Sequence, residues 1–262
     1  MSTYNSAAFA GLLCQLCGTL AGFAVAGLIF VVALHPREDS QDAPSGLVRG
    51  PVRGAGDRDL PVALLTSSFI GLILSALAYA LMAGEPAGSA RLATDQIIAG
   101  AGFGTGALVL LFAVHRLVCG ASPSLDRWTR HVVGIGAPCV VWLYLAEGTR
   151  YVGSLCKADQ GVLWLVLGST AAVQFLAGVT AFVRPRRAPM PAGGVMRVAS
   201  TGVAVPTMTT LAVALTPTLL PNDAAAPTGV LYVLLAVSTV GLAYFTLQVG
   251  RAPRSEESAV LD

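Results

Sequence analysis

Long apolar runs alternate with shorter polar connections along the whole chain. No Asp, Glu, Lys, Arg or His lies at the centre of any run. A helix needs about 20 apolar residues to cross the roughly 30 Å hydrocarbon layer of a bilayer. Six runs are close to that length or longer, and the fourth could continue through the sequence EGTRYVGSL. The pattern predicts seven transmembrane helices, at residues 7–34, 62–83, 97–114, 132–146, 162–183, 198–220 and 229–249.

The same pattern predicts the domain organisation. We expect an all-α, polytopic membrane protein in which residues 1–262 form one seven-helix domain. The first run is too long, and its flank too poor in Lys and Arg, for a signal peptide, so we expect a retained helix. The connection at 35–61 mixes Pro, Gly and charges of both signs, and it predicts a mobile cytoplasmic loop. Residues 250–262 predict a polar cytoplasmic tail.

The composition agrees with a chain that is solvated by lipid. Hydrophobic residues make up 55% of the sequence, and charged residues only 11%, against about 25% in soluble domains. The net charge of +2 gives no support for nucleic-acid binding. Lys157 is the only lysine beside fifteen arginines, and Ala and Gly are abundant, which is typical of GC-rich bacterial genomes. We therefore expect a multi-pass protein of a bacterial plasma (inner) membrane, with the bilayer as its first partner.

The basic residues predict how the chain is threaded. Thirteen of the sixteen lie in the connections after the first, third and fifth helices or in the C-terminal tail. The other three are Arg91, Arg150 and Lys157. Because Lys and Arg concentrate on the cytoplasmic side of membrane proteins, the N-terminus is predicted outside and the C-terminus in the cytoplasm.

Three ionisable residues near helix ends are candidates for an outward-facing ligand site. Asp95 opens the third predicted helix, and Glu147 and Arg150 lie at the outer end of the fourth. Residues three apart on a helix are neighbours, so Glu147 and Arg150 can pair. They could line a site for a polar ligand, or they could form an interfacial ion pair that ends the helix.

Uncharged polar residues and prolines mark a second candidate region. Gln174 in the fifth helix and Thr207 in the sixth could line a path for a solute. Pro138 and Pro206 each lack an amide hydrogen, and each has a glycine four residues earlier, so kinks are predicted there. The bends could frame a cavity or act as hinges, and they could equally be static.

The sequence GFGTGA, at 102–107, fits the G-x-G-x-x-A variant of the dinucleotide fingerprint. That fingerprint needs a strand, a tight turn and a helix, whereas these glycines lie inside one apolar run. Their spacing instead makes two G-x-x-x-G pairs, which allow membrane helices to approach closely. The third helix is therefore predicted to be central, packed through Gly100, Gly102, Gly104 and Gly106. Gly18 and Gly22 of the first helix have the same spacing and are predicted to pack as well.

Several classes of chemistry find no support in the sequence. The last helix has no lysine for a retinal Schiff base, and no phosphate-binding or zinc-protease motif occurs. His35, His115 and His131 lack compact metal-ligand spacing, and Cys14 and Cys17 lie in an apolar helix where cysteine is a good apolar residue. We expect no metal, no cofactor and no enzymatic activity.

Two function classes remain. The first is a non-catalytic seven-helix bundle that senses, scaffolds or binds a membrane or cytoplasmic protein partner. The second is a transporter or channel for a neutral or hydrophobic solute, along a path lined by the fourth, fifth and sixth helices. A transporter should contain a solute-sized cavity or a polar passage near the midplane, whereas a partner-binding bundle should have a closed core.

Overall fold

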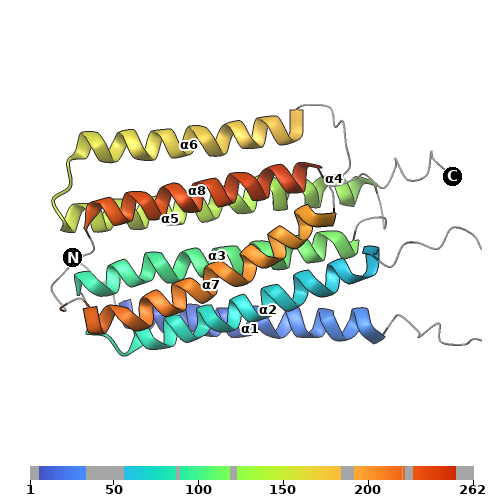
Figure 1. Ribbon diagram of the computed structural model, residues 1–262, viewed down its shortest axis with the longest axis horizontal. Coiled ribbons are helices and arrows are strands. Elements are labelled where there is room, and N and C mark those ends of the chain that lie inside the picture. The colour runs from blue at the N-terminus through green and yellow to red at the C-terminus, as the bar shows by residue number, and fades with distance from the viewer. Residues whose placement is uncertain are drawn as a thin grey trace, which may run out of the picture.

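A computed structural model describes residues 6–33, 56–86, 89–118, 123–183, 192–219, 221 and 227–251. Every regular element in these ranges is a helix (Figure 1). The helices are α1 (Ser6–Ala33), α2 (Gly56–Ala83), α3 (Ala90–Val118), α4 (Pro123–His131), the π-helical turn η1 (Val132–Gly136), α5 (Ala137–Leu155), α6 (Gln160–Val183), α7 (Ala192–Leu219) and α8 (Thr228–Arg251).

The seven predicted spans are confirmed in number and order. Seven helical stretches of the described chain are long and apolar enough to cross a membrane, and α4, η1 and α5 together form the fourth. That span continues to Leu155, through the sequence that could extend it. The third begins at Ala90, seven residues before its predicted start, and α2 begins at Gly56, inside the predicted loop at 35–61. The rest of that loop, and residues 252–262 of the predicted tail, lie outside the described residues.

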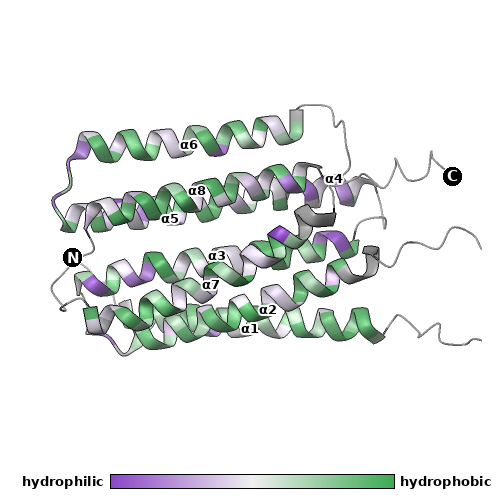
Figure 2. Cartoon of the chain, in the orientation of Figure 1, coloured by the Kyte–Doolittle hydropathy of each residue, from purple (hydrophilic) through white to green (hydrophobic). Residues whose placement is uncertain are grey.

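The helices lie roughly side by side, with α1 and α6 at opposite edges of the bundle (Figure 1). One group consists of α1, α2, α3 and α7, and the other consists of α5, α6 and α8. The α3 helix belongs to the first group, packs also on α5, and is the most buried of the seven spans. Hydrophobic residues cover the helices along their lengths, and hydrophilic ones gather toward the ends (Figure 2).

We name the two ends of the bundle by residues that lie there. The α4 end holds α4 and the C-terminal ends of α1, α3, α6 and α8. The Glu85 end holds Glu85 and the connections α2–α3, α5–α6 and α7–α8. The described chain therefore starts at the Glu85 end and finishes at the α4 end, as expected for an odd number of spans.

Glycines of α2, α3 and α7 bring these three helices close together. A Cβ atom added to Gly71 would lie 2.7 Å from the carbonyl oxygen of Gly202 and 3.7 Å from the Cα of Gly106. The hydroxyl of Ser68 on α2 also donates to the Gly106 carbonyl, at 3.0 Å. Lipid offers no hydrophobic drive for helix association, so close approach of this kind and interhelical hydrogen bonds stabilise the contact.

The four glycines of α3 face three neighbouring helices, α5, α7 and α2. A Cβ atom at Gly100 or Gly104 would meet Tyr144 or Val141 of α5 within 3 Å. At Gly102 the added atom would lie 2.6 Å from Thr209 Oγ1 of α7, and Gly106 packs on α2. Each G-x-x-x-G pair therefore serves a separate face of this central helix.

The glycines of α1 do not have the predicted packing role within the described chain. Gly18 and Gly22 are exposed, and a Cβ atom on either would meet nothing within 4 Å. The buried face of α1, with Cys17, Ala21 and Ala24, packs on α2 instead. The shared spacing carried no information on which face of each helix meets protein.

The prolines lie where the structure adjusts the helical hydrogen bonding. Before Pro138, the amide of Ala137 donates to the Val132 carbonyl, five residues earlier, which is the wide turn of a π-helix. In α7, Pro206 lies in a continuous helix, and the hydroxyls of Thr209 and Thr210 donate to its carbonyl at 2.8 Å. Movement at either proline stays a prediction.

Candidate functional site

A cavity of about 500 Å³ lies between four helices of the bundle. Its wall is formed by α3 from Ile98 to Val109, by two residues of α5, by α7 from Val198 to Ala212 and by α8 from Val230 to Phe245. At a rise of about 1.5 Å per residue, the α8 stretch is roughly 22 Å long. The cavity therefore extends along much of the predicted hydrocarbon layer.

The cavity exists because α7 and α8 pack on different partners. The α7 helix packs on α2 and α3, whereas α8 packs on α5 and α6, and the two make little contact with each other. Small residues on both helices, including Ala204, Ala212 and Gly241, line the space that is left. Side chains at its rim, such as Met208 and Val237, are 67% and 64% exposed. The cavity therefore opens sideways, between α7 and α8, toward the surroundings of the bundle.

The wall of the cavity is mostly apolar. Most lining side chains are aliphatic, and the three threonines among them are already hydrogen-bonded to their own helices. The hydroxyls of Thr105, Thr201 and Thr209 donate to carbonyls three or four residues earlier, at 2.8 Å. A molecule in this space would meet apolar surface and few polar groups in need of a partner.

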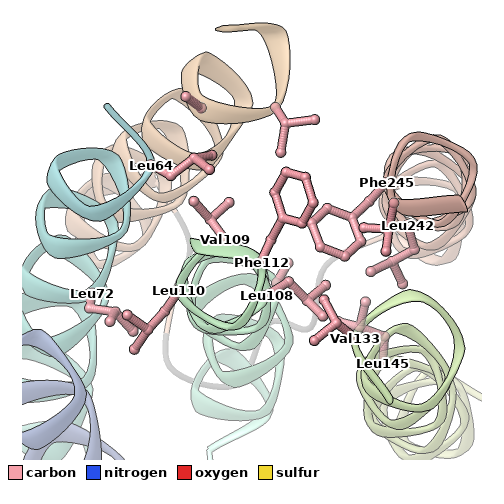
Figure 3. Packing of buried hydrophobic residues seen from close by; sticks show 14 of the residues in the cluster. Leu64, Leu72, Leu108, Val109, Leu110, Phe112, Val133, Leu145, Leu242 and Phe245 are labelled. Atoms are coloured by element: carbon pink, nitrogen blue, oxygen red, sulfur yellow. The ribbon is translucent and has the colours of Figure 1, made fainter. Parts of the chain in front are cut away.

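Packed aromatic rings lie where the cavity reaches the α4 end. Phe112 of α3 and Phe245 of α8 point toward each other in an edge-to-face arrangement, with centroids 5.8 Å apart (Figure 3). Leu242 and Val133 lie close by (Figure 3). Phe112 also stacks on His115, at 6.3 Å between ring centroids. This packing joins α3 to α8 at the α4 end of the bundle.

Beyond these rings, a buried polar cluster joins α3 to α4. His115, Asp126 and Arg130 are each at most 5% exposed. Asp126 pairs with Arg130 at 3.0 Å, and His115 Nε2 lies 3.9 Å from Asp126. His115 Nδ1 lies 3.0 Å from the Thr129 hydroxyl. The cluster fixes α4 against α3.

Asp95 is placed differently from the prediction. Because α3 starts at Ala90, Asp95 lies in its second turn, 1% exposed, rather than at an open helix end. Thr216 of α7 donates to its Oδ2 at 3.0 Å, and its Oδ1 has no hydrogen-bond partner among the described residues. One helical turn earlier, Arg91 pairs with Glu85 in partly buried surroundings.

Glu147 and Arg150 form an ion pair at 3.7 Å, and their side chains are 74% and 54% exposed. The guanidinium of Arg150 also lies 5.5 Å from the ring centroid of Trp164 on α6. The pair does not end the helix, because α5 continues to Leu155. Since Asp95 is buried, the three predicted residues do not share one exposed site.

Gln174 and Thr207 do not line the cavity. Gln174 is 5% exposed and donates to Thr246 at 3.1 Å, so it joins α6 to α8. Thr207 is exposed, and its hydroxyl donates to the Val203 carbonyl of its own helix. This cavity does not follow the path predicted along the fourth, fifth and sixth helices. The cavity is lined by α3, α5, α7 and α8, which are the third, fourth, sixth and seventh spans, and α6 contributes nothing to it.

No metal-binding constellation occurs in the described ranges, since no three His, Cys, Asp or Glu side chains lie together there. Cys14 and Cys17 are free thiols that pack in the bundle. The position of the cavity could not be predicted from the sequence, because the residues that line it form no motif. The one available signal was the run of small residues and threonines in the sixth predicted helix.

Comparisons of the chain with protein-family models, with curated proteins and with solved structures find no match. The assignment therefore depends on the residues and the geometry above. Seven helices of sufficient length and hydropathy make the chain a multi-pass integral membrane protein, and the cavity between α7 and α8 is its candidate site.

Proposed function

We propose that this protein is a non-catalytic membrane bundle that takes up a hydrophobic molecule from the bilayer through the opening between α7 and α8. The observation that carries the proposal is the cavity of about 500 Å³ with its apolar wall. Ligand sites in proteins are typically clefts of about 300–1,000 Å³ with mostly apolar linings. The volume and the chemistry of this cavity therefore fit a small hydrophobic molecule or a lipid chain.

The direction of entry follows from the side on which the cavity is open. Met208 and Val237 at its rim are exposed on the flank of the helices, where lipid would surround a spanning bundle. An apolar molecule dissolved in the bilayer can reach the cavity there without crossing water.

A sensing role accounts for these features best. Occupancy would change the spacing of α7 and α8, and the π-helical turn before Pro138 and the proline in α7 offer places where such a change can be absorbed. A protein partner at the membrane or in the cytoplasm would read the change. Transport of the same molecule is the second candidate, favoured by the length of the cavity along α8. Flux of an alkyl probe across reconstituted vesicles distinguishes the two.

The charge distribution supports one orientation, with the α4 end in the cytoplasm of a bacterial cell. Thirteen of the sixteen basic residues lie in the predicted C-terminal tail or in the connections predicted after the first, third and fifth helices. The substitution Lys157→Cys, made in a variant without native cysteines, should allow labelling by a membrane-impermeant maleimide in intact cells. Protection of that cysteine in intact cells, with labelling after lysis, would reverse the orientation.

Gly241→Phe is expected to block uptake of a hydrophobic probe. Gly241 lines the cavity, and a Cβ atom added there would meet nothing within 4 Å, so a larger side chain can extend from this position into the cavity. A long-chain alcohol with a diazirine at mid-chain, photolysed in lipid nanodiscs, should label α7 and α8 in the wild-type protein. We expect labelling at the cavity wall to fall at least about tenfold in the variant, since the ring removes much of a ligand-sized volume.

The matched control is Gly168→Phe on α6. Gly168 is also exposed, an added Cβ meets nothing within 4 Å, and the residue lies outside the cavity. Its labelling at α7 and α8 should equal that of the wild-type protein. Equal labelling of the cavity wall in the wild-type protein and in the Gly241→Phe variant would overturn the proposed function.

A further inference from the structure

The α4 end of the cavity carries a cation that uptake of a purely apolar molecule would not use. Arg197 lies on α7 four residues before Thr201, on the helical face that also carries Ala204 and Met208. Residues at these spacings lie above one another on a helix, so Arg197 extends the lining face by one turn. Its side chain is exposed, and no ion pair joins it to another residue of the described ranges.

A buried amide extends the opposite wall in the same direction. Gln248 lies on α8, four residues after Tyr244 and three after Phe245, both of which line the cavity. It is 6% exposed, and its amide makes no hydrogen bond with another residue of the described chain. Its nitrogen and oxygen are not among the fully enclosed polar atoms that lack a partner, so the amide is accessible and can donate a hydrogen bond to a ligand at this level.

The charges at the two ends of the cavity differ in sign. Near the Glu85 end, Asp95 is a buried carboxylate and Arg91 is paired with Glu85. At the α4 end, the carboxylate of Asp126 is paired with Arg130. Asp126 therefore does not neutralise the positive charge of Arg197. An elongated molecule with one negative end is therefore favoured with that end beside Arg197.

We propose that the occupant of the cavity is an anionic membrane lipid. An acyl chain of this lipid lies between α7 and α8. Its negatively charged headgroup lies at the α4 end, next to the guanidinium of Arg197 on α7 and at the same level as the amide of Gln248 on α8. Arginine is suited to phosphate because its planar guanidinium donates two parallel hydrogen bonds. Anionic lipids are concentrated in the cytoplasmic leaflet, which is the leaflet at the α4 end in the proposed orientation. This inference rests on the proposed function and adds the chemical class of the ligand.

Competition between two lipids tests the inference. Nanodiscs would contain equal amounts of phosphatidylglycerol and phosphatidylcholine, each with a mid-chain diazirine and a distinct mass, and labelled peptides would be counted after photolysis. One cationic side chain near a membrane surface is worth about 1 kcal/mol, which is a factor of roughly five in lipid preference. We expect that preference for phosphatidylglycerol at the α7 and α8 cavity wall, and a much smaller one on the lipid face of α6.

Arg197→Gln should abolish the preference at the cavity wall, and Arg197→Lys should keep most of it because the charge remains. Arg127→Gln is the matched control, since Arg127 is an exposed arginine of α4 at the same end of the bundle and outside the cavity. It should leave the preference unchanged. An equal loss in both glutamine variants would identify general surface attraction and would overturn the inference.

The outcomes also separate this inference from the proposed function. Labelling of the cavity wall by both lipids alike, with no response to Arg197→Gln, would overturn the anionic ligand while leaving hydrophobic uptake in place. Absence of labelling by either lipid at the cavity wall in the wild-type protein would overturn both.

Discussion

Gly71→Ala should lower the stability of the bundle strongly, although it adds one methyl group. The new Cβ would lie 2.7 Å from the Gly202 carbonyl oxygen and 3.1 Å from Pro206 Cγ, so α2 and α7 would have to separate. The Gly202 carbonyl lies four residues before Pro206, which has no amide hydrogen to donate to it. This carbonyl belongs to the helix backbone, which cannot move aside as a flexible side chain could. We expect a loss of about 2 kcal/mol in the free energy of unfolding, measured by SDS titration in mixed micelles.

Gly22→Ala is the control for this substitution. Gly22 lies in α1, and an added Cβ meets nothing within 4 Å, so only helix propensity changes. Alanine is the better helix former by roughly 0.5–1 kcal/mol, and the variant should be as stable as the wild-type protein or more so. Equal destabilisation by both substitutions would contradict the close approach of α2 and α7.

Asp126→Asn should destabilise the protein by about 3 kcal/mol, because it removes one partner of a buried ion pair. Asp126 is 5% exposed, pairs with Arg130 at 3.0 Å and faces His115. The neutral amide keeps the shape of the side chain, and the charge of Arg130 then remains in a desolvated place. The same titration measures the effect, and α4 should become the most protease-sensitive helix.

The exposed pair of Glu147 and Arg150 provides the matched comparison. Its side chains are 74% and 54% exposed, and exposed pairs contribute less than about 1 kcal/mol. Glu147→Gln should therefore change the midpoint of unfolding very little. A shift as large as that of Asp126→Asn would mean that burial does not govern the energetics of these pairs.

The number and order of the spans could be predicted from the sequence because each is a long apolar run between polar connections. The residue at which α3 begins could not be predicted in the same way. Arg91 and Asp95 suggested an interface, whereas the helix begins at Ala90 and buries both residues. The partner of Asp95 is Thr216, 121 residues away, and that pairing leaves no trace in local sequence. Charges near a predicted helix end are thus compatible with burial when another helix supplies a hydrogen bond.

The glycines show a second limit of prediction from sequence. Gly100 to Gly106 and the pair Gly18 and Gly22 have the same spacing, yet only the α3 glycines lie at helix contacts in the described chain. Spacing fixes which residues share a face, and the neighbouring helices decide whether that face meets protein. For α1, the packed face carries Cys17 and Ala21 instead.

The class of ligand could be predicted from the sequence better than the helices that line the site. A hydrophobic solute was one of the expected ligand classes, and threonines of the sixth span do border the cavity. Polarity alone makes Gln174 and Thr207 candidates for the lining of a solute path, but each donates a hydrogen bond to an acceptor within the protein. The cavity arises from the divergence of α7 and α8, which depends on the partners that each helix packs against.

The most direct test of hydrophobic uptake is a cryo-electron microscopy map of the protein in lipid nanodiscs, bound to a rigid antibody fragment. We expect elongated density between α7 and α8, from the level of Val230 to that of Phe245, next to Gly241. The Gly241→Phe variant should lack that density. A map in which α7 and α8 close against each other along this stretch, with no space or density between them, would contradict the uptake of a hydrophobic molecule there.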